Sequence, residues 1–378
     1  MKILMTSIVD LRKSQHNRPH QFVKHLSKNH EVTVLSINDW WKGSQTDMNS
    51  YSSDLNDFLQ NVDIRYLTDT KVSPVLQELF FTREIKKLSK EDFDVHFNYN
   101  SLITGSRFSK DFKTVFDLAD DLPEMIAHSP QIPGFLKGIG KWMGERYLKR
   151  DIEQAELVTL TTETLKETYN VPDEKSVIIP NGVNTENFKN VVNAKEELGI
   201  EGFIVGYVGV LREWVDLEPV LRALKELPED IKLLVVGSEG EFQENRELAA
   251  RSGLGDRVIF TGMVPYSRVP LYISAMDVGL IPFKTNGIAN NALPIKLFEY
   301  MACEKPVIST ELTPVTSKFN NNVLYASNSE EYLQCIELLH NDEELRRRMG
   351  KKGRKIVLSG YDWEFISKKL EDVLKEVC

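Results

Sequence analysis

The sequence predicts an α/β protein with two parallel sheets, and three observations support this fold class. Short runs of β-branched and aromatic residues alternate along the chain with longer amphipathic stretches. The alternation starts again after a polar, turn-rich stretch at residues 181–187. The apolar runs also outnumber the roughly ten strands that one twisted sheet accommodates. Alternating strands and helices favour parallel sheets that are covered by helices on both faces.

In the first half of the chain, the candidate strands are only a few residues long. They lie at residues 3–6, 32–35, 64–67, 95–99, 114–118, 157–160 and 177–179. The stretches between most of them place apolar residues at helical spacing, as after Pro19 and again between Leu76 and Leu88.

The second half repeats this pattern and predicts a second sheet. Its candidate strands lie at residues 203–208, 233–236, 258–260, 278–281, 307–309 and 323–325. We expect the boundary between the sheets near residues 181–200, where the linker composition lies. The tail predicts one long amphipathic helix that needs an apolar surface to dock on. Its apolar positions are Phe365, Ile366, Leu370, Val373 and Leu374.

Composition excludes several classes of protein. The chain of 378 residues has 47 Lys+Arg against 56 Asp+Glu, a net charge of −9, which disfavours a nucleic-acid partner. Three cysteines are too few for a disulfide framework. No stretch reaches the roughly 18 apolar residues of a membrane span, and the amino terminus lacks a signal-peptide pattern. We therefore expect a cytoplasmic protein.

Neither a metal site nor a nucleotide cofactor is expected. The sequence has no His-Glu-x-x-His or Cys-x-x-Cys motif, and its seven histidines are dispersed. The first candidate strand is followed by residues 8–13, which contain no glycine, so the dinucleotide-binding fingerprint is missing.

The stretch 285–310 predicts a loop, a helix and a strand that together suit an anion. Pro294 fits the first turn of a helix, and the loop before it contains Gly287 and three asparagines. Such a loop leaves backbone N–H groups free at a helix amino terminus, as a diphosphate requires. Glu299 lies five residues beyond Pro294 and either accepts hydrogen bonds from paired ribose hydroxyls or faces solvent without a function.

Residues 291–310 resemble the nucleotide-binding segment of the retaining glycosyltransferases of group 1, glycosyltransferase family 4, which have the GT-B fold. Four further segments resemble the same family in chain order. They are the interdomain Pro-Asn-Gly-Val signature at 177–188, the strand and glycine turn at 203–209, the strand and turn at 234–240, and the base-binding segment at 258–264.

This resemblance implies two Rossmann-like domains whose parallel sheets face each other across a cleft. Residues 1–183 with 361–378 would form the acceptor-binding domain, and residues 184–360 would bind the nucleotide sugar. Glu299 would hold the ribose hydroxyls, and Met263 or Val264 would meet the base through backbone groups. The loop with Asn290 would face the donor sugar and diphosphate, and the Gly209 turn would close the first strand of the second domain.

The sequence departs from the family pattern at two places. A glutamate common in the family is replaced by Asn291, which still hydrogen-bonds sugar hydroxyls but supplies no charge. Both cations of the family's Gly-Arg-Leu…Lys-Gly segment are also changed. Arg212 or Lys296 is our hypothesis for the replacement cation; for Lys296 the alternative is an i,i+3 helix pair with Glu299.

In the first half, carboxylates end the candidate strand at 114–118. The segment Phe116–Asp121 is similar to a Tyr-Asp-x-x-Asp segment of a family subset, which implies a position near the reacting sugar for Asp117 and Asp120. The alternative for Asp117 is a loop cap. Arg18 and Pro19 are similar to an Arg-Pro pair of the same subset, which implies contact with a phosphate or an acidic acceptor; the alternative is a surface-loop arginine.

The function implied by the resemblance is a metal-independent hexosyltransferase that uses a nucleotide-sugar donor and a saccharide or lipid-linked acceptor in polysaccharide or glycoconjugate biosynthesis. Two alternatives remain open. One is a non-transferring GT-B enzyme such as a sugar-nucleotide epimerase, and the other is a binding protein without catalysis.

Residues 135–150 predict a basic amphipathic helix with five cations, one anion and apolar bulk that includes Trp142. Such a helix lies on an anionic membrane surface or packs as an ordinary helix of the first domain. The first possibility would place the protein peripherally on the inner face of the membrane.

Overall fold

The computed structural model describes residues 1–14, 16–39, 57–128, 132–237, 244–285 and 287–378. The chain divides into two compact units. The first comprises Met1–Pro180 and Glu364–Cys378, and the second comprises Asn181–Trp363. Each unit is built on its own parallel sheet, so the predicted fold class is confirmed.

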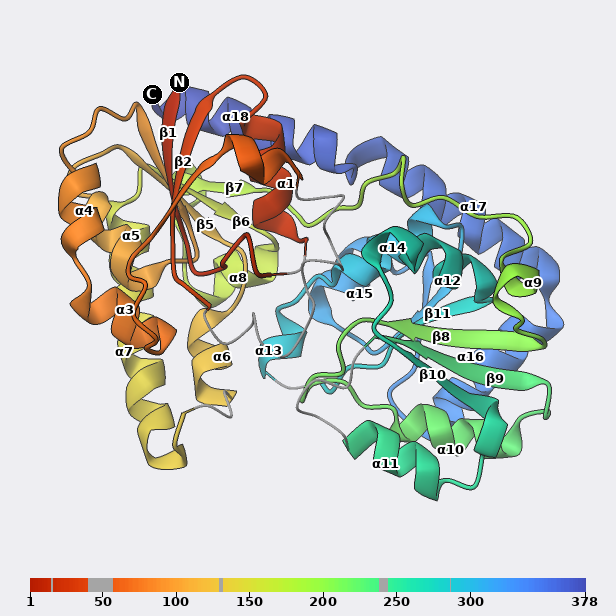
Figure 1. Cartoon of the computed structure of the whole chain (residues 1–378). Helices are drawn as coiled ribbons and strands as arrows, with labels where there is room; N and C mark the ends of the chain where they lie inside the picture. The colour runs from red at the N-terminus through yellow and green to blue at the C-terminus, as the bar shows by residue number, and fades with distance from the viewer. Residues whose placement is uncertain (15, 40–56, 129–131, 238–243, 286) are drawn as a thin grey trace. The chain divides into compact units, whose positions relative to one another are not determined.

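The first unit contains a seven-stranded sheet in the order β3-β2-β1-β4-β5-β6-β7 (Figure 1). Its strands are β1 (Lys2–Ser7), β2 (Glu31–Ser36), β3 (Asp63–Tyr66), β4 (Val95–Tyr99), β5 (Thr114–Leu118), β6 (Leu157–Leu160) and β7 (Ser176–Ile178). Its helices are α1 (Arg18–Leu26), α3 (Pro74–Phe80), α4 (Arg83–Leu88), α5 (Leu102–Phe108), α6 (Leu122–His128), α7 (Gly134–Gln154), α8 (Glu163–Thr168) and α18 (Trp363–Val377), with 3-10 turns η1 (Asp57–Asn61) and η2 (Asp173–Lys175).

The second unit contains a six-stranded sheet in the order β10-β9-β8-β11-β12-β13. Its strands are β8 (Phe203–Val208), β9 (Ile231–Val236), β10 (Val258–Gly262), β11 (Val278–Ile281), β12 (Val307–Ser309) and β13 (Val323–Tyr325). Its helices are α9 (Ala194–Leu198), α10 (Glu218–Glu226), α11 (Glu244–Arg251), α12 (Val269–Ala275), α13 (Gly287–Asn290), α14 (Ile295–Ala302), α15 (Thr313–Phe319), α16 (Ser329–Asn341) and α17 (Glu343–Gly360), with 3-10 turns η3 (Gly255–Arg257) and η4 (Tyr266–Arg268).

Each apolar run predicted as a strand forms one. Burial on both faces of a parallel sheet explains the central strands, whereas the edge strands β3, β7 and β10 are only partly buried. Every residue of β4, β5, β8 and β11 is buried. Figure 1 shows α12 and α14 on one side of the second sheet and α10 and α11 on the other. Strand order reverses direction between β1 and β4 and between β8 and β11. In open α/β sheets, ligands bind beyond the carboxyl ends of strands at such switch points.

Three local predictions need correction. Pro294 is the N-cap of α14 and has extended backbone (ψ 133°), so the helix begins one residue later than expected. Residues 287–290, expected as loop, form the short helix α13. Phe365 is 60% exposed, whereas the other predicted apolar positions of the last helix are buried. Of the turn expected at 237–240, Ser238, Glu239 and Gly240 lie outside the described residues, as does Asn286 of the 285–291 loop.

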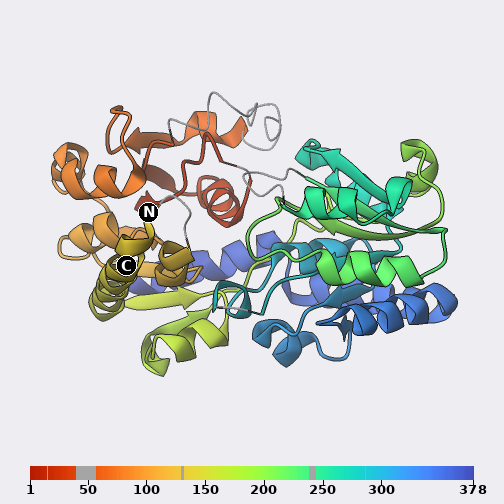
Figure 2. The same cartoon turned by 90° about the horizontal axis from the view of Figure 1, so that it is seen from below.

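The last helix, α18, is held on the first unit by one buried carboxylate. Oε1 of Glu371 lies 2.5 Å from Lys375 Nζ and 3.1 Å from His30 Nε2, and its Oε2 lies 3.1 Å from His25 Nε2. The hydrogen bonds from Lys375 and from the two histidines hold the pKa of Glu371 well below its usual range, although burial acts in the opposite direction. Figures 1 and 2 both place the two chain ends side by side, and Cys378 Sγ lies 3.4 Å from Met1 Sδ.

Glu371→Gln is expected to lower the free energy of unfolding by about 1.5–3 kcal/mol at neutral pH, the range for hydrogen bonds to a charged group. Because the pKa of Glu371 is depressed in the folded state, its contribution is present above the ordinary value of 4.5 and declines as pH falls below it. Urea unfolding measures the change. Glu376→Gln, an exposed neighbour on the same helix, is the control and should change stability by less than about 0.5 kcal/mol. Equal effects of the two substitutions would contradict this account of α18.

Within the described ranges, the structure has no helix both long enough and apolar enough to span a bilayer.

Candidate functional site

Three glycine turns end neighbouring strands at the carboxyl edge of the second sheet. Gly209, Gly237 and Gly262 have φ values of 132°, 135° and 68°, which side-chain-bearing residues rarely adopt. Gly209 N donates to Val236 O at 2.9 Å, and Gly237 N donates to Gly262 O at 3.0 Å. A Cβ on Gly237 would lie 2.3 Å from Gly209 O. Gly237 therefore requires glycine because the backbones approach closely, and the positive φ values favour glycine at all three positions.

Lys296 brings a cation to the switch point between β8 and β11. Its Nζ lies 5.1 Å from the ring centroid of Tyr207 in β8 and 4.9 Å from that of Phe283 beyond β11. A Cβ on Gly209 would lie 3.6 Å from the same Nζ. Burial lowers the pKa of Lys296 to about 8, and the charge of Glu299 opposes that shift. Among the described residues, Lys296 and Glu299 form no direct ion pair and influence each other only through their charges. The i,i+3 helix pair, which was the alternative to a diphosphate contact, is therefore not formed directly.

Glu299 lies three residues further along α14 and is buried, with 6% of its surface exposed. Tyr266 Oη donates a hydrogen bond to Glu299 Oε1 at 2.8 Å. Burial raises the pKa of Glu299, while the Tyr266 hydrogen bond and the Lys296 charge lower it. The reading of Glu299 as a solvent-facing residue is therefore wrong, because the side chain is enclosed and oriented.

The segment after β10 positions Tyr266 beside Glu299. Met263 is half-buried and Val264 is buried, and Pro265 then begins the 3-10 turn η4 that carries Tyr266. Tyr266 is not among the residues predicted from the sequence. Its only sequence signal is its place just beyond residues 258–264, which were predicted to bind the base, since the contact with Glu299 spans 33 residues of sequence.

The other predicted donor residues of the second unit lie around the same edge. Arg212 is exposed in the loop after Gly209, and its charge opposes the rise that burial causes in the pKa of Tyr207. Asn290 Oδ1 accepts from Thr313 N at 3.4 Å and from Thr313 Oγ1 at 3.1 Å, so it helps to hold the start of α15. Asn291 is half-buried.

In the first unit, Arg18 and Asp117 bind each other. Arg18 Nη2 donates to Asp117 Oδ1 at 2.7 Å, and Arg18 Nε donates to Asp117 Oδ2 at 2.9 Å. Arg18 Nη1 donates to Pro180 O at 3.0 Å, and Thr159 Oγ1 donates to Asp117 Oδ1 at 2.6 Å. Both side chains are buried. Arg18 is therefore no surface-loop arginine, and Asp117 is no loop cap; they join α1, β5, β6 and the end of the first unit's main segment.

Asp120 is the carboxylate that remains accessible just beyond β5. Its side chain is exposed although protein atoms crowd around it, and Asn100 Nδ2 donates to its Oδ2 at 3.4 Å. Desolvation by the protein atoms around it raises the pKa of Asp120 to about 6; Arg18 opposes this shift, and the charges of Asp117 and Asp121 add to it. The predicted trio therefore separates into a buried ion pair, Arg18 with Asp117, and one exposed carboxylate, Asp120.

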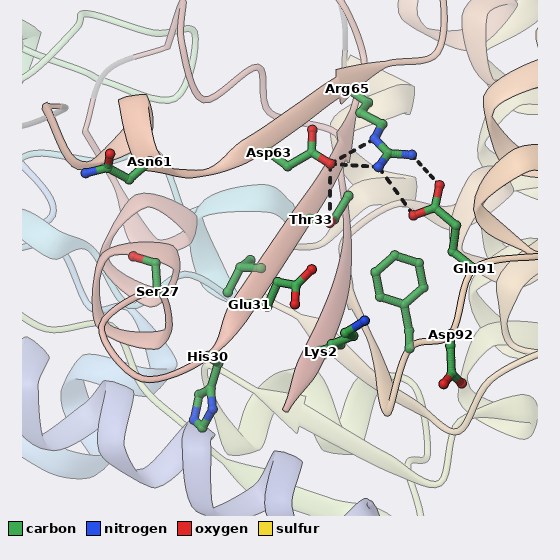
Figure 3. A pocket seen from close by; sticks show the side chains of 12 residues that line it. Lys2, Ser27, His30, Glu31, Thr33, Asn61, Asp63, Arg65, Glu91 and Asp92 are labelled. Atoms are coloured by element: carbon green, nitrogen blue, oxygen red, sulfur yellow. Dashed lines mark hydrogen bonds and ion pairs between the residues drawn. The ribbon is translucent and has the colours of Figure 1, made fainter.

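A separate polar cavity of about 400 Å³ lies at the opposite edge of the first sheet, beside the amino ends of β1 and β2 (Figure 3). Arg65 on its wall is engaged by Asp63 at 2.8 Å and by Glu91 at 2.6 Å. Because ligand sites of parallel sheets lie at the carboxyl edge, we do not assign this cavity to the site. In the part of the chain that the structure describes, no group of three or more His, Cys, Asp or Glu residues is arranged to hold a metal ion.

Most of the second unit is similar to a known protein family. Residues 189–356 match the family model of group 1 glycosyl transferases. This match covers most of the second unit, including the Gly209 turn, Tyr266, Lys296 and Glu299.

Two curated relatives match about half of the chain. A Bacillus subtilis protein named as the teichuronic acid biosynthesis glycosyltransferase TuaH is 30% identical over 188 residues, covering 47% of this chain and 45% of the relative. The GDP-mannose-dependent alpha-(1-6)-phosphatidylinositol monomannoside mannosyltransferase of Mycobacterium tuberculosis is 26% identical over 211 residues, covering 52% and 55%. The chain thus spans about half the length of the curated relatives it matches.

Solved structures share the fold over the whole chain. Sucrose-phosphate synthase from Thermosynechococcus elongatus aligns with a TM-score of 0.78 at 18% identity, covering 100% of this chain and 98% of the other. Anabaena HepE in complex with UDP-glucose aligns with a TM-score of 0.77 at 18% identity, covering 100% of both chains. The GT-B fold expected from the sequence, with two parallel-sheet α/β domains, is confirmed.

Proposed function

We propose that this chain is a retaining glycosyltransferase. It transfers a hexose-type sugar from a nucleotide-sugar donor to a saccharide or lipid-linked acceptor in polysaccharide or glycoconjugate biosynthesis. The observation that carries the proposal is the placement of Lys296 and Glu299, one cation and one oriented carboxylate, on a single helix beside the Gly209 turn. The family match over the second unit supports it, as does the name of the Bacillus relative.

In this proposal the second unit, Asn181–Trp363, binds the donor. Glu299 accepts hydrogen bonds from the ribose hydroxyls through Oε2, since Tyr266 already donates a hydrogen bond to Oε1. Backbone groups of Met263 and Val264 meet the base. Lys296, Arg212 and the amino terminus of α14 hold the diphosphate. Asn290 and Asn291 face the sugar. The binding of UDP and of UDP-glucose by HepE, which has the same fold, supports a nucleotide-sugar donor.

The first unit, Met1–Pro180 with Glu364–Cys378, binds the acceptor beside Asp120. The acceptor hydroxyl oxygen attacks the anomeric carbon on the face from which the diphosphate departs. A bond forms from that oxygen to the anomeric carbon as the bond to the diphosphate oxygen breaks, and the acceptor's proton passes to the departing diphosphate. Catalysis then rests on positioning and on stabilising the charge that builds on the diphosphate, without a resident metal.

A thermal-shift screen with nucleoside diphosphates and their sugars tests the donor class. We expect one base to raise the melting temperature, because a ligand that binds only the folded state stabilises it. Absence of stabilisation by every nucleotide would remove the proposal. Turnover of a nucleotide sugar to an epimer without acceptor would favour the non-transferring alternative instead.

Tyr266→Phe is expected to raise the donor Michaelis constant roughly tenfold with a smaller change in kcat, because it removes one hydrogen bond from the carboxylate that binds ribose. Steady-state kinetics with the identified donor measure this effect. Tyr272→Phe, on the adjacent α12, is the matched control and should leave the Michaelis constant unchanged. A change in kcat alone would show that Tyr266 does not act through donor binding.

A further inference from the structure

Helix α7 packs two of its glycines against α6. A Cβ on Gly140 would lie 2.9 Å from Ile126 Cγ2, and a Cβ on Gly144 would lie 3.2 Å from Ile126 Cδ1. The two glycines therefore allow α6 and α7 to lie side by side at short distance. Figure 1 shows the pair projecting together from the first unit, beyond its sheet.

The opposite side of α7 exposes large apolar side chains. Phe135, Ile139 and Trp142 are 82%, 56% and 58% exposed, and they follow each other at helical spacing on one side. In the first half of α7 the usual amphipathic order is thus reversed, with glycine inside and aromatic residues outside, whereas Leu148 and Ile152 in the second half are buried. Apolar surface exposed to water is unfavourable, and a contiguous exposed apolar patch marks an interaction site.

Two cations lie on the same side of the helix, further along the chain. Arg146 and Lys149 follow Trp142 at spacings of four and three residues, and both are exposed. The Arg146 guanidinium lies 5.9 Å from the Trp142 ring centroid. We call Phe135, Ile139, Trp142, Arg146 and Lys149 the α7 stripe. Residues 134–150 carry five cations and one anion, in a chain whose net charge is −9.

We propose that the α7 stripe lies on an anionic membrane surface. Aromatic and aliphatic side chains enter the boundary between headgroups and acyl chains, while Lys and Arg contact lipid phosphates. Charge complementarity selects this occupant. A second copy of the same stripe has no anionic residue to offer Arg146 and Lys149, and an acidic surface without an apolar phase would leave Phe135 and Trp142 in water. The proposal does not depend on the proposed transferase activity.

Vesicle co-sedimentation tests it, with the full chain and vesicles of phosphatidylcholine alone or mixed with phosphatidylglycerol. We expect binding to the anionic vesicles at low salt that weakens as salt is raised. The triple variant Phe135→Ala, Ile139→Ala, Trp142→Ala should bind at least tenfold less. Phe80→Ala, which removes a phenylalanine that is 71% exposed elsewhere on the same unit, should bind as the wild type does.

The double variant Arg146→Glu, Lys149→Glu tests the charge of the stripe. Its control is Lys351→Glu, which changes an exposed lysine of α17. The stripe variant should lose binding at least tenfold, and the control should retain it. Unchanged melting temperatures establish that the variants fold. Absence of wild-type binding to anionic vesicles at low salt, or equal binding by the triple variant, overturns the proposal. Concentration-dependent dimerisation that the triple variant abolishes, without vesicle binding, would assign the stripe to a second copy instead.

Discussion

Arg18→Ala is expected to destabilise the protein by about 3–5 kcal/mol, the range for breaking a buried ion pair by removing one partner. The substitution leaves the Asp117 carboxylate buried without its main donors, and it also frees Pro180 O. Arg18 also covers the Phe22 ring at 4.6 Å, so some packing is lost as well. Chemical denaturation of the full chain measures the change.

The matched control is Arg83→Ala, which removes an exposed arginine from the same unit and should change stability by less than about 0.5 kcal/mol. The double variant Arg18→Ala, Asp117→Ala should be less destabilised than the sum of the single variants, because no unpaired charge remains buried. If Arg18→Ala costs no more than Arg83→Ala, Arg18 is not the structural anchor described here and becomes a candidate for substrate contact again.

Lys296 is expected to make donor binding pH-dependent. Its pKa is lowered to about 8 by burial, so the ammonium is present below pH 8 and is lost as pH rises above it. If the ammonium holds the diphosphate, kcat/KM for the donor should fall on the alkaline side with an apparent pKa near 8, since this quantity reports the free enzyme. Lys296→Met should weaken donor binding roughly 10- to 100-fold at pH 7, as the loss of a charge-assisted contact predicts.

Lys296→Arg separates charge from titration. Arginine stays protonated throughout the accessible pH range, so this variant should retain part of the donor affinity and lose the alkaline fall. Lys225→Met, which removes an exposed lysine from α10, is the control and should leave both affinity and pH profile unchanged. A wild-type profile that stays flat up to pH 10 would mean that Lys296 does not bind the diphosphate, and Arg212 would then be the remaining candidate.

The strands were predictable because burial on both faces leaves a local signature. The runs at 95–99, 114–118 and 203–208 are strands with the predicted bounds. Pro294 illustrates the limit of such signals. Its fixed φ of −66° suits either a first helical residue or an N-cap, and only ψ distinguishes the two.

The site was predictable as a set of positions but not as a set of contacts. Glu299 and Lys296 lie on one helix, so the sequence placed them near each other. Their partners come from elsewhere in the chain, since Tyr266 reaches Glu299 from the segment after β10. Arg18 and Asp117 are 99 residues apart, and their carboxylate–guanidinium pairing depends on β1 and β5 both lying in the same sheet. Contacts of this kind arise from topology, which local periodicity does not encode.

Calorimetric titration measures whether the second unit binds a nucleotide through Glu299 and Lys296. The nucleoside diphosphate identified by the thermal-shift screen is titrated into the wild type, Glu299→Ala, Lys296→Met and the control Lys225→Met. We expect one site in the wild type and the control, and affinity at least tenfold lower in each of the two site variants. Equal affinity in all four proteins, or no nucleotide binding by the wild type, would contradict this expectation.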